Sequence, residues 1–300
     1  MSQAKAALGR RLFFDPQLSV SDRYSCASCH RPDHAYTDRR RLAVGATGQR
    51  LPRRTMSLVD AAYEIALGWT EPGAPSLEKQ MLTPMFNEHP VELGLYGRQD
   101  ALLAALSRDP PYRRAFRHAF PCNGRAVTLR HVVQAIASFE RTLIFGDSPF
   151  DRYVFGDDLR ALSPAAKAGM ALFFSKRLGC AACHSGIDFD GNWRDSEGRT
   201  GPASYANDGT SRVPIRVPTL RDVALSAPYM HDGRFATLSE VLDHYERVGR
   251  KPDSRHGGTR DPRLRAFRLT LRERGELIAF LDSLTDPRLA RRTGASRPSR

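Results

Sequence analysis

The residues with the clearest chemical meaning form two copies of one five-residue pattern. Cys26-Ala-Ser-Cys29-His30 and Cys180-Ala-Ala-Cys183-His184 both read C-x-x-C-H. This pattern is typical of c-type haem attachment, in which both thiols bond covalently to the haem and the histidine nitrogen binds the iron. We therefore expect two covalently bound haem c groups, with His30 and His184 as iron ligands.

Other uses of the cysteines are weaker alternatives. One C-x-x-C pair would also suit a redox disulfide or half of a zinc site. A zinc site would need four ligands converging from both halves of the chain, and the histidine that follows each pair favours haem. A fifth cysteine, Cys122 in "AFPCNGR", is expected to be a spare loop thiol.

The elements that position the two motifs also repeat. A short helical pattern ending in Leu-Phe-Phe precedes each motif, in "ALGRRLFFDPQLS" and in "AKAGMALFFSKRLG". Ser163-Pro164 supplies an N-cap and a first-turn proline to the second of these helices. "VTLRHVVQAIASFERTLI" predicts a helix between the motifs. Thr270 and Glu273 form a capping box at the start of the last helix, "TLRERGELIAFLDSL".

This order of elements predicts an all-α protein with two cytochrome c-like domains joined near "GDSPFDRY". We expect an N-terminal domain over residues 1–150, a C-terminal domain over 151–285 and a basic flexible tail over 286–300. Long loops connect the helices of each domain.

The chain is strongly basic, with a net charge of +13 and a pI of about 10.0. The propionates of two haems would offset about four of these charges. Basic residues are scattered and no stripe of aromatic and basic residues is present, so an acidic partner protein is expected rather than nucleic acid.

No segment predicts a membrane span, since no apolar run approaches the roughly 18 residues required. The start, "MSQAKAALGRRLFF", also lacks a signal-peptide core. Because C-x-x-C-H haem attachment normally takes place in an export compartment, we expect a periplasmic protein whose leader is absent from this sequence.

The order of motifs resembles the bacterial di-haem cytochrome c peroxidase / MauG family over nearly the whole chain. The shared stretches are "LGRRLFFDPQLS", "CASCH", "CAACH", "VPTLRDVALSAPYMHDGRFATL" and "LIAFLDSLTD". "PMFNEHPVELGL" and "SFERTLIFGDSPFDRYV" look most like the MbnH-like branch, described as oxidising tryptophan on a partner protein. The resemblance implies that hydrogen peroxide reacts at the N-terminal haem and that the C-terminal haem accepts or stores electrons.

The resemblance assigns two further catalytic residues. Glu92, in "HPVEL", matches the family's catalytic glutamate, and a carboxylate near the iron can move a proton between the peroxide oxygens. Glu88 is the rival carboxylate. Trp69, in "LGWTEPGAPSLEKQ", matches the tryptophan that relays electrons between the haems, although a buried core tryptophan is the structural alternative. Trp193 is expected to face the surface or a partner.

The first iron is expected to be open on its distal side. The loop after the first motif offers only His34, four positions from His30, and this residue should not reach the opposite haem face. Classical peroxidases of the family bring a distal histidine from this loop, and the lack of one here resembles MauG-like members. His89 is an alternative pocket residue.

The stretch "MHDGRFATLSEVLDHY" predicts a helix that starts at a capping box formed by Thr237 and Glu240. At about 100° per residue, one face collects Leu238, Val241, Leu242 and Tyr245. His244 points away from that face and is expected to be solvent-facing.

The resemblance implies that Tyr245 is the distal ligand of the second haem iron, as in MauG-like members. Met230 is the alternative, because methionine is a common c-haem ligand. His231 is expected to be a pocket residue and not a ligand. A tyrosinate would stabilise ferric and higher states, whereas methionine would stabilise ferrous iron.

A calcium ion is a further implication of the resemblance. Backbone carbonyls near "RVPTL" would hold it, at Arg216 and Pro218. Thr55 stands where the family has an asparagine, which weakens the expected site.

These observations predict a di-haem peroxidase-like oxidoreductase that uses hydrogen peroxide to oxidise a partner protein by long-range electron transfer. One alternative is a cytochrome c peroxidase that takes electrons from a small cytochrome or cupredoxin. Another is a non-catalytic di-haem electron carrier. The loop over residues 190–214 is expected to be flexible and to help recognise a partner.

Overall fold

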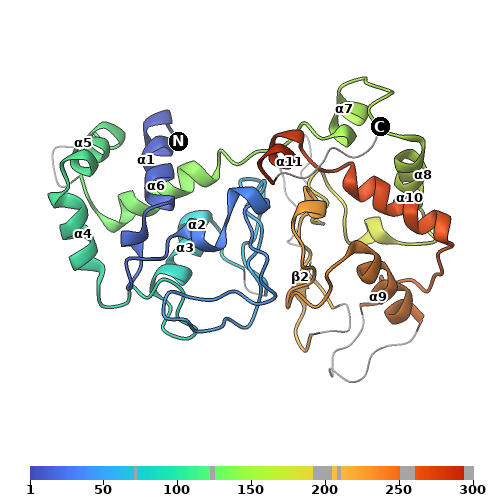
Figure 1. The fold of residues 1–300 in the computed structure, drawn as a ribbon, viewed down its shortest axis with the longest axis horizontal. Coiled ribbons are helices and arrows are strands. Elements are labelled where there is room, and N and C mark those ends of the chain that lie inside the picture. The colour runs from blue at the N-terminus through green and yellow to red at the C-terminus, as the bar shows by residue number, and fades with distance from the viewer. Residues whose placement is uncertain (71–72, 122–125, 192–204, 208–210, 251–260, 294–300) are drawn as a thin grey trace. The chain divides into compact units, whose positions relative to one another are not determined.

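The structure is a computed structural model that describes residues 1–70, 73–121, 126–191, 205–207, 211–250 and 261–293. This part of the chain is mostly helical, with eleven α-helices, four short 3-10 helices and one small sheet (Figure 1). The chain divides into two compact units. The first comprises Met1–Pro32, Tyr36–Tyr63 and Ala74–Ile144; the second comprises Asp33–Ala35, Glu64–Gly73 and Phe145–Arg300.

Six helices build the first unit. They are α1 (Gln3–Phe13), α2 (Cys26–Cys29), α3 (Leu77–Phe86), α4 (Gln99–Arg108), α5 (Pro110–Ala119) and α6 (Leu129–Glu140), with a 3-10 turn at Pro16–Leu18. A further 3-10 turn, Pro32–His34, begins in this unit, and its last two residues belong to the second. The Thr128 hydroxyl accepts the His131 N–H at 3.2 Å and so begins α6.

Helices α1 and α6 cross at very short range. A Cβ atom on Gly9 would lie 1.8 Å from the Ala135 carbonyl oxygen, so only glycine fits there. One turn later, Phe13 is fully buried and its ring lies 5.1 Å from that of Phe139. The helical pattern before the first motif therefore forms one side of the core of this unit.

Five helices build the second unit. They are α7 (Pro149–Phe155), α8 (Pro164–Phe173), α9 (Leu238–Arg250), α10 (Leu271–Asp282) and α11 (Pro287–Thr293), with 3-10 turns at Cys180–Ala182 and Val223–Leu225. The predicted Ser163 N-cap is confirmed by its bond from the Ala166 N–H at 3.1 Å. The predicted Thr270–Glu273 capping box is also present, at the start of α10.

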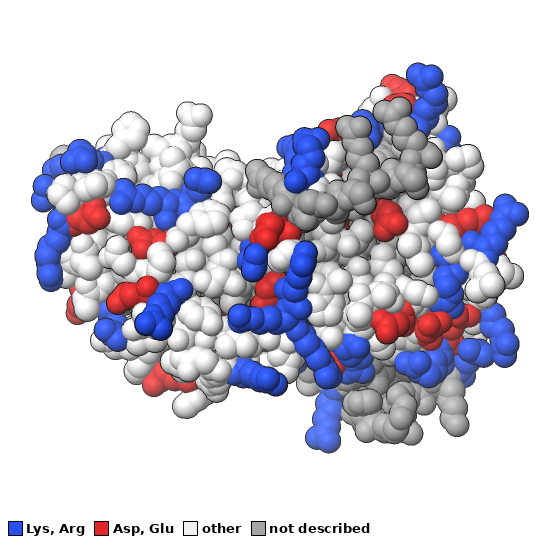
Figure 2. Space-filling view, viewed as in Figure 1, with Lys and Arg blue, Asp and Glu red and all other residues white. Residues whose placement is uncertain are grey.

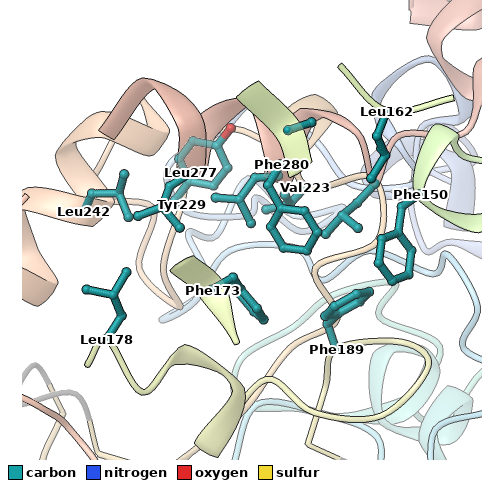
Figure 3. Close-up of a cluster of buried hydrophobic side chains, with 13 residues drawn as sticks. Phe150, Leu162, Phe173, Leu178, Phe189, Val223, Tyr229, Leu242, Leu277 and Phe280 are labelled. Atoms are coloured by element: carbon teal, nitrogen blue, oxygen red, sulfur yellow. The ribbon is translucent and has the colours of Figure 1, made fainter. Parts of the chain in front are cut away.

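Helices α8 and α10 repeat the close crossing of the first unit. A Cβ on Gly169 would lie 1.9 Å from the Glu276 carbonyl oxygen. Four residues later, Phe173 packs against Phe280 and Phe189, with ring centroids 5.1 and 5.8 Å apart, as Figure 3 shows. The glycine and phenylalanine spacing is thus the structural core of the internal repeat.

The division of the chain differs from the expected cut near residue 150 in two internal segments. Residues 33–35 and 64–73 belong to the second unit, although they lie far towards the N-terminus. Segment 64–73 joins that unit because Thr70 pairs with Ile215 of β2 (Ile215–Arg216). Strand β2 also pairs with β1 (Tyr205–Ala206) in an antiparallel ladder, so the protein is mostly rather than entirely α.

The expected flexible tail is wrong for residues 286–293. Helix α11 occupies most of this stretch, and Leu289 is fully buried. Asp286 accounts for the order: its carboxylate accepts the Arg288 and Asp147 N–H groups at 2.7 and 3.1 Å. Its own N–H donates to the Asp222 carboxylate at 2.8 Å.

The surface carries charges of both signs. Lys and Arg side chains occupy many separate places on the face shown in Figure 2, with Asp and Glu side chains among them. In the described residues, no helix has the length and apolar character that a membrane span requires.

Candidate functional site

The first C-x-x-C-H motif lies on a single helical turn. Helix α2 is the motif itself, and the Ser28 hydroxyl supports its start by accepting the Ser25 N–H at 2.9 Å. His30 follows directly, and its Nδ1 lies 3.0 Å from the Tyr36 carbonyl oxygen. With Nδ1 as donor, Nε2 is left as the nitrogen that can bind iron. Burial lowers the pKa of His30, which keeps its imidazole neutral as metal binding requires.

The second motif repeats this geometry with a different local helix. Cys180 begins a 3-10 turn directly after Gly179 and Cys183 follows its end, and His184 Nδ1 lies 2.8 Å from the Phe189 carbonyl oxygen. Burial again lowers the pKa of the imidazole. Tyr36 and Phe189, the two carbonyl acceptors, both have a left-handed backbone, with φ of 53° and 54°. This conformation is uncommon outside glycine and marks matching histidine supports in both motifs.

The four motif cysteines suit thioether attachment. None of them forms a disulfide, and all are partly buried. Burial raises the pKa of each thiol, to about 11 for Cys29 and Cys180, so the free thiols stay protonated at neutral pH. In the described stretches, no group of three or more His, Cys, Asp or Glu side chains could hold a metal ion.

The backbone around Glu92 is held tightly by a loop of the same unit. The Ala46 N–H donates to the Glu92 carbonyl oxygen at 2.6 Å, and the Val91 N–H donates to the Gln49 side chain at 2.9 Å. Gly45 permits this approach, since a Cβ there would lie 2.0 Å from the Val91 carbonyl oxygen. The carboxylate of Glu92 is thus presented from a rigid loop pair.

The environment of Glu92 fits proton transfer better than that of its rivals. Burial raises the pKa of Glu92, and its negative charge helps raise the pKa of the Cys29 thiol, which places it near the first motif. Glu88 and His89 are exposed to solvent. The catalytic role of Glu92 stays a prediction, but of these three residues it alone is withdrawn from water.

Trp69 lies in the second unit because segment 64–73 belongs there. It is half-buried, and its ring meets that of His231 edge to face, with centroids 6.5 Å apart. His231, which was expected to be a pocket residue, is 9% exposed and packs against the Trp69 ring. His34 is buried, with Nε2 3.6 Å from the Asp33 carboxylate.

Helix α9 starts as predicted, but its buried face is wider than the sequence indicated. Glu240 accepts the Thr237 N–H at 2.8 Å in the expected capping box. Tyr245 is half-buried. The expectation that His244 faces solvent is wrong: it is 2% exposed, and its ring lies 5.3 Å from that of Phe235.

The physical reason for the burial of His244 is the turn that precedes α9. Tyr229 pairs with Phe235 and folds this turn onto the helix, which covers a side that helical periodicity alone left exposed. The Arg247 guanidinium also meets His244 Nδ1 at 3.2 Å. Met230, the alternative ligand, is half-buried in the same turn with φ of 70°.

The expected calcium residues have other contacts in the structure. Thr55 is in the first unit, and its carbonyl oxygen accepts the Thr37 hydroxyl at 2.7 Å. Arg216 and Pro218 are in the second unit, where the Pro218 carbonyl faces His184 and raises its pKa. Calcium binding stays a prediction. Cys122, Trp193 and most of the loop over 190–214 lie outside the described residues.

Two buried carboxyl groups were not found by sequence reasoning. Glu64 has a pKa raised to about 7 and Glu140 one raised to about 8, in both cases mainly by burial. Glu140 also helps raise the pKa of Cys26 and therefore lies close to the first motif. Its position in "SFERT" at the end of a strongly apolar helix face was the available signal.

Two mostly helical units, each with a partly buried histidine directly after a C-x-x-C pair, define a di-haem c-type protein. The family model for di-haem cytochrome c peroxidase (CCP_MauG) matches residues 3–159. The chain is 37% identical to the methylamine utilization protein MauG of Methylorubrum extorquens, across 95% of this chain and 79% of that protein. It belongs to the di-haem cytochrome c peroxidase / MauG family and is an enzyme of that family, with sites for two haem c groups.

Two further relatives place the chain within this family. Identity to cytochrome c551 peroxidase of Pseudomonas aeruginosa is 32%, across 81% of this chain and 71% of that protein. A crystal structure of a MauG-like protein associated with microbial copper homeostasis has a TM-score of 0.88 and 32% identity, covering 98% of this chain and 93% of that one.

Proposed function

We propose that this protein uses hydrogen peroxide to oxidise a partner protein by long-range electron transfer, in the manner of MauG-like and MbnH-like enzymes. Peroxide accepts two electrons and two protons and yields two water molecules; the electrons come from the partner. A tryptophan side chain on that partner is the substrate that the MbnH-like resemblance implies. The half-buried carboxyl of Glu92 beside the first motif is the observation that supports this function most directly.

Glu92 carries the proton in this scheme. A haem held at His30 would supply the iron at which peroxide reacts and exchanges electrons. Glu92 would take a proton from one peroxide oxygen and deliver it to the other, which leaves as water. Burial raises the pKa of Glu92 above that of a solvent-exposed glutamate, which suits a group that must both take up and release a proton.

Trp69 and Tyr245 serve the electron side of the reaction. Trp69 relays electrons, supported by its half-buried ring and its edge-to-face contact with His231. Tyr245 would supply a phenolate oxygen to the iron of a haem held at His184, and Met230 is the alternative ligand. In terms of the predicted domains, residues 1–150 hold the peroxide-reactive haem and residues 151–285 hold the haem that stores oxidising equivalents.

The decisive experiment adds one equivalent of peroxide to the diferric protein. We expect a long-lived oxidised absorption spectrum without prior reduction. Glu92→Gln should slow its formation by a factor of about 10² or more while both haems stay bound. Glu88→Gln is the matched control, since Glu88 is exposed on the same loop, and should react at the wild-type rate.

A cytochrome c peroxidase that draws electrons from a small cytochrome or cupredoxin is the second candidate. The similarity to cytochrome c551 peroxidase of Pseudomonas aeruginosa favours it. A reaction that starts only after one haem is reduced, with fast turnover on such donors, would establish this function instead.

Two further parts of the proposal have direct tests. The protein works in the periplasm, and cell fractionation of the full-length gene product should recover its haem there. A calcium ion held by the carbonyl groups of Arg216 and Pro218, with Thr55 at the position of the family's asparagine, would appear as one equivalent of calcium by elemental analysis. Protein that keeps its reactivity after chelation and contains no calcium would contradict that site.

A further inference from the structure

One arginine side chain and its backbone hold the segment that carries Trp69. The Arg216 N–H donates to the Trp69 carbonyl oxygen at 2.9 Å, and its Nε donates to the Gly68 carbonyl oxygen at 3.0 Å. The adjacent residues, Thr70 and Ile215, form an isolated antiparallel bridge. Two consecutive carbonyl groups at the tryptophan are therefore bound by a single residue of β2.

The guanidinium of Arg216 is itself held by a buried carboxylate. Glu64 lies 2.7 Å from it, and the two side chains are only 4% and 3% exposed. Glu64 begins the segment 64–73 and Trp69 lies five positions later, so the ion pair holds the start of this stretch against the strand. All these contacts lie within the second unit.

Stability is a weak explanation for such a pair. Removing two charges from water costs about as much as their attraction returns, and a buried ion pair can often be replaced by apolar residues without loss. Its best-supported use is to specify one conformation among several. Arginine suits this use because its planar fork can bind a carboxylate and a carbonyl oxygen at once, which a lysine ammonium cannot do with the same geometry.

We propose that the Glu64–Arg216 ion pair is a positioning device that sets the orientation of the Trp69 indole against His231. This inference rests on the proposed role of Trp69 as an electron relay. Electron transfer through a ring depends on its distance and angle to its neighbours, so a fixed backbone at Gly68 and Trp69 keeps the relay in its productive geometry. Neither Glu64 nor Arg216 exchanges electrons or protons with peroxide.

The test measures ring orientation separately from reactivity. Ultraviolet resonance Raman spectra of the di-haem protein contain an indole band that reports the torsion between Cβ and the ring. The Trp69→Phe spectrum identifies the Trp69 contribution by subtraction. Arg216→Lys and Glu64→Gln should shift or broaden this band. Arg212→Lys, an exposed arginine four residues away, should leave it unchanged.

The same variants are then tested for reaction with peroxide. We expect Arg216→Lys and Glu64→Gln to form the oxidised spectrum about tenfold more slowly or worse, with both haem spectra otherwise normal. Glu64→Asp, which keeps the charge, should recover part of the rate and of the Raman band. If Arg216→Lys fails to fold, the comparison of Glu64→Gln with Glu64→Asp still tests the positioning role.

Two results would overturn different parts of the argument. An unchanged indole band in Arg216→Lys and Glu64→Gln would refute the positioning role, whatever the rates. A shifted band together with a wild-type rate in Trp69→Phe would confirm the positioning and refute the relay role of Trp69.

Discussion

Replacing Gly169 by alanine tests the contact on which the core of the second unit depends. The added Cβ would lie 1.9 Å from the Glu276 carbonyl oxygen and 2.9 Å from the Phe280 Cβ. Real Cβ atoms keep at least 3.0 Å, so helices α8 and α10 must separate by more than 1 Å at this point. The obstacle is helix backbone, which cannot rotate away as a side chain can.

The size of the effect follows from what this separation disturbs. Phe280 is fully buried among the rings of Phe173, Phe189 and Phe150, so moving α10 loosens the whole aromatic cluster (Figure 3). Overpacking of a tight core typically costs about 1–3 kcal/mol, and occasionally more. We expect a loss at the upper end, about 3 kcal/mol, even though alanine gains about 1 kcal/mol of helix propensity over glycine.

The assay is urea unfolding of the di-haem protein, followed by near-ultraviolet circular dichroism. Gly275→Ala is the matched control, because Gly275 lies on α10 and a Cβ there meets nothing within 4 Å. That variant should be as stable as the wild type or up to about 1 kcal/mol more stable. Equal stability of Gly169→Ala and Gly275→Ala would refute the close-crossing argument.

Three further outcomes are expected. Gly9→Ala should destabilise the first unit by a similar amount, because its Cβ would lie 1.8 Å from the Ala135 carbonyl oxygen; urea unfolding followed by the absorbance of the haem at His30 measures this. Burial raises the pKa of Glu140 from 4.5 to about 8, with Arg141 lowering it and Glu78 raising it, so the native carboxyl keeps a proton that the unfolded chain releases. Stability should therefore fall by roughly 4 kcal/mol as pH rises from about 4.5 to 8, and Glu140→Gln should remove this dependence in denaturation curves at pH 5 and 9. Tyr245→Phe should change the electron paramagnetic resonance signal of the second haem. If that signal is unaltered in Tyr245→Phe but changes in Met230→Leu, then Met230 and not Tyr245 is the ligand.

The features that the sequence predicted are those that depend on near neighbours along the chain. A C-x-x-C-H motif places two thiols and an imidazole within five residues, so haem attachment follows from covalent spacing alone. The capping box of α10 spans four residues, and the Leu-Phe-Phe helices before each motif follow from a 3.6-residue period. The catalytic roles of Glu92 and Trp69 were predicted from the family resemblance.

The features that sequence reasoning missed depend on contacts between distant segments. His244 is buried because a preceding turn folds over α9, and α11 is ordered because Asp286 meets Asp147 and Asp222. Segment 64–73 joins the second unit through β2, which begins about 140 residues later. Periodicity reports which side of a helix is apolar, but it does not report what the chain brings against the other side.

By itself, the sequence predicted the chemistry of attachment, two haem c groups at two C-x-x-C-H motifs, because that chemistry needs only residues that are neighbours in the chain. The tertiary structure alone decided which carboxyl groups leave water and how Trp69 is held, because burial and the Arg216 contacts join residues far apart in sequence.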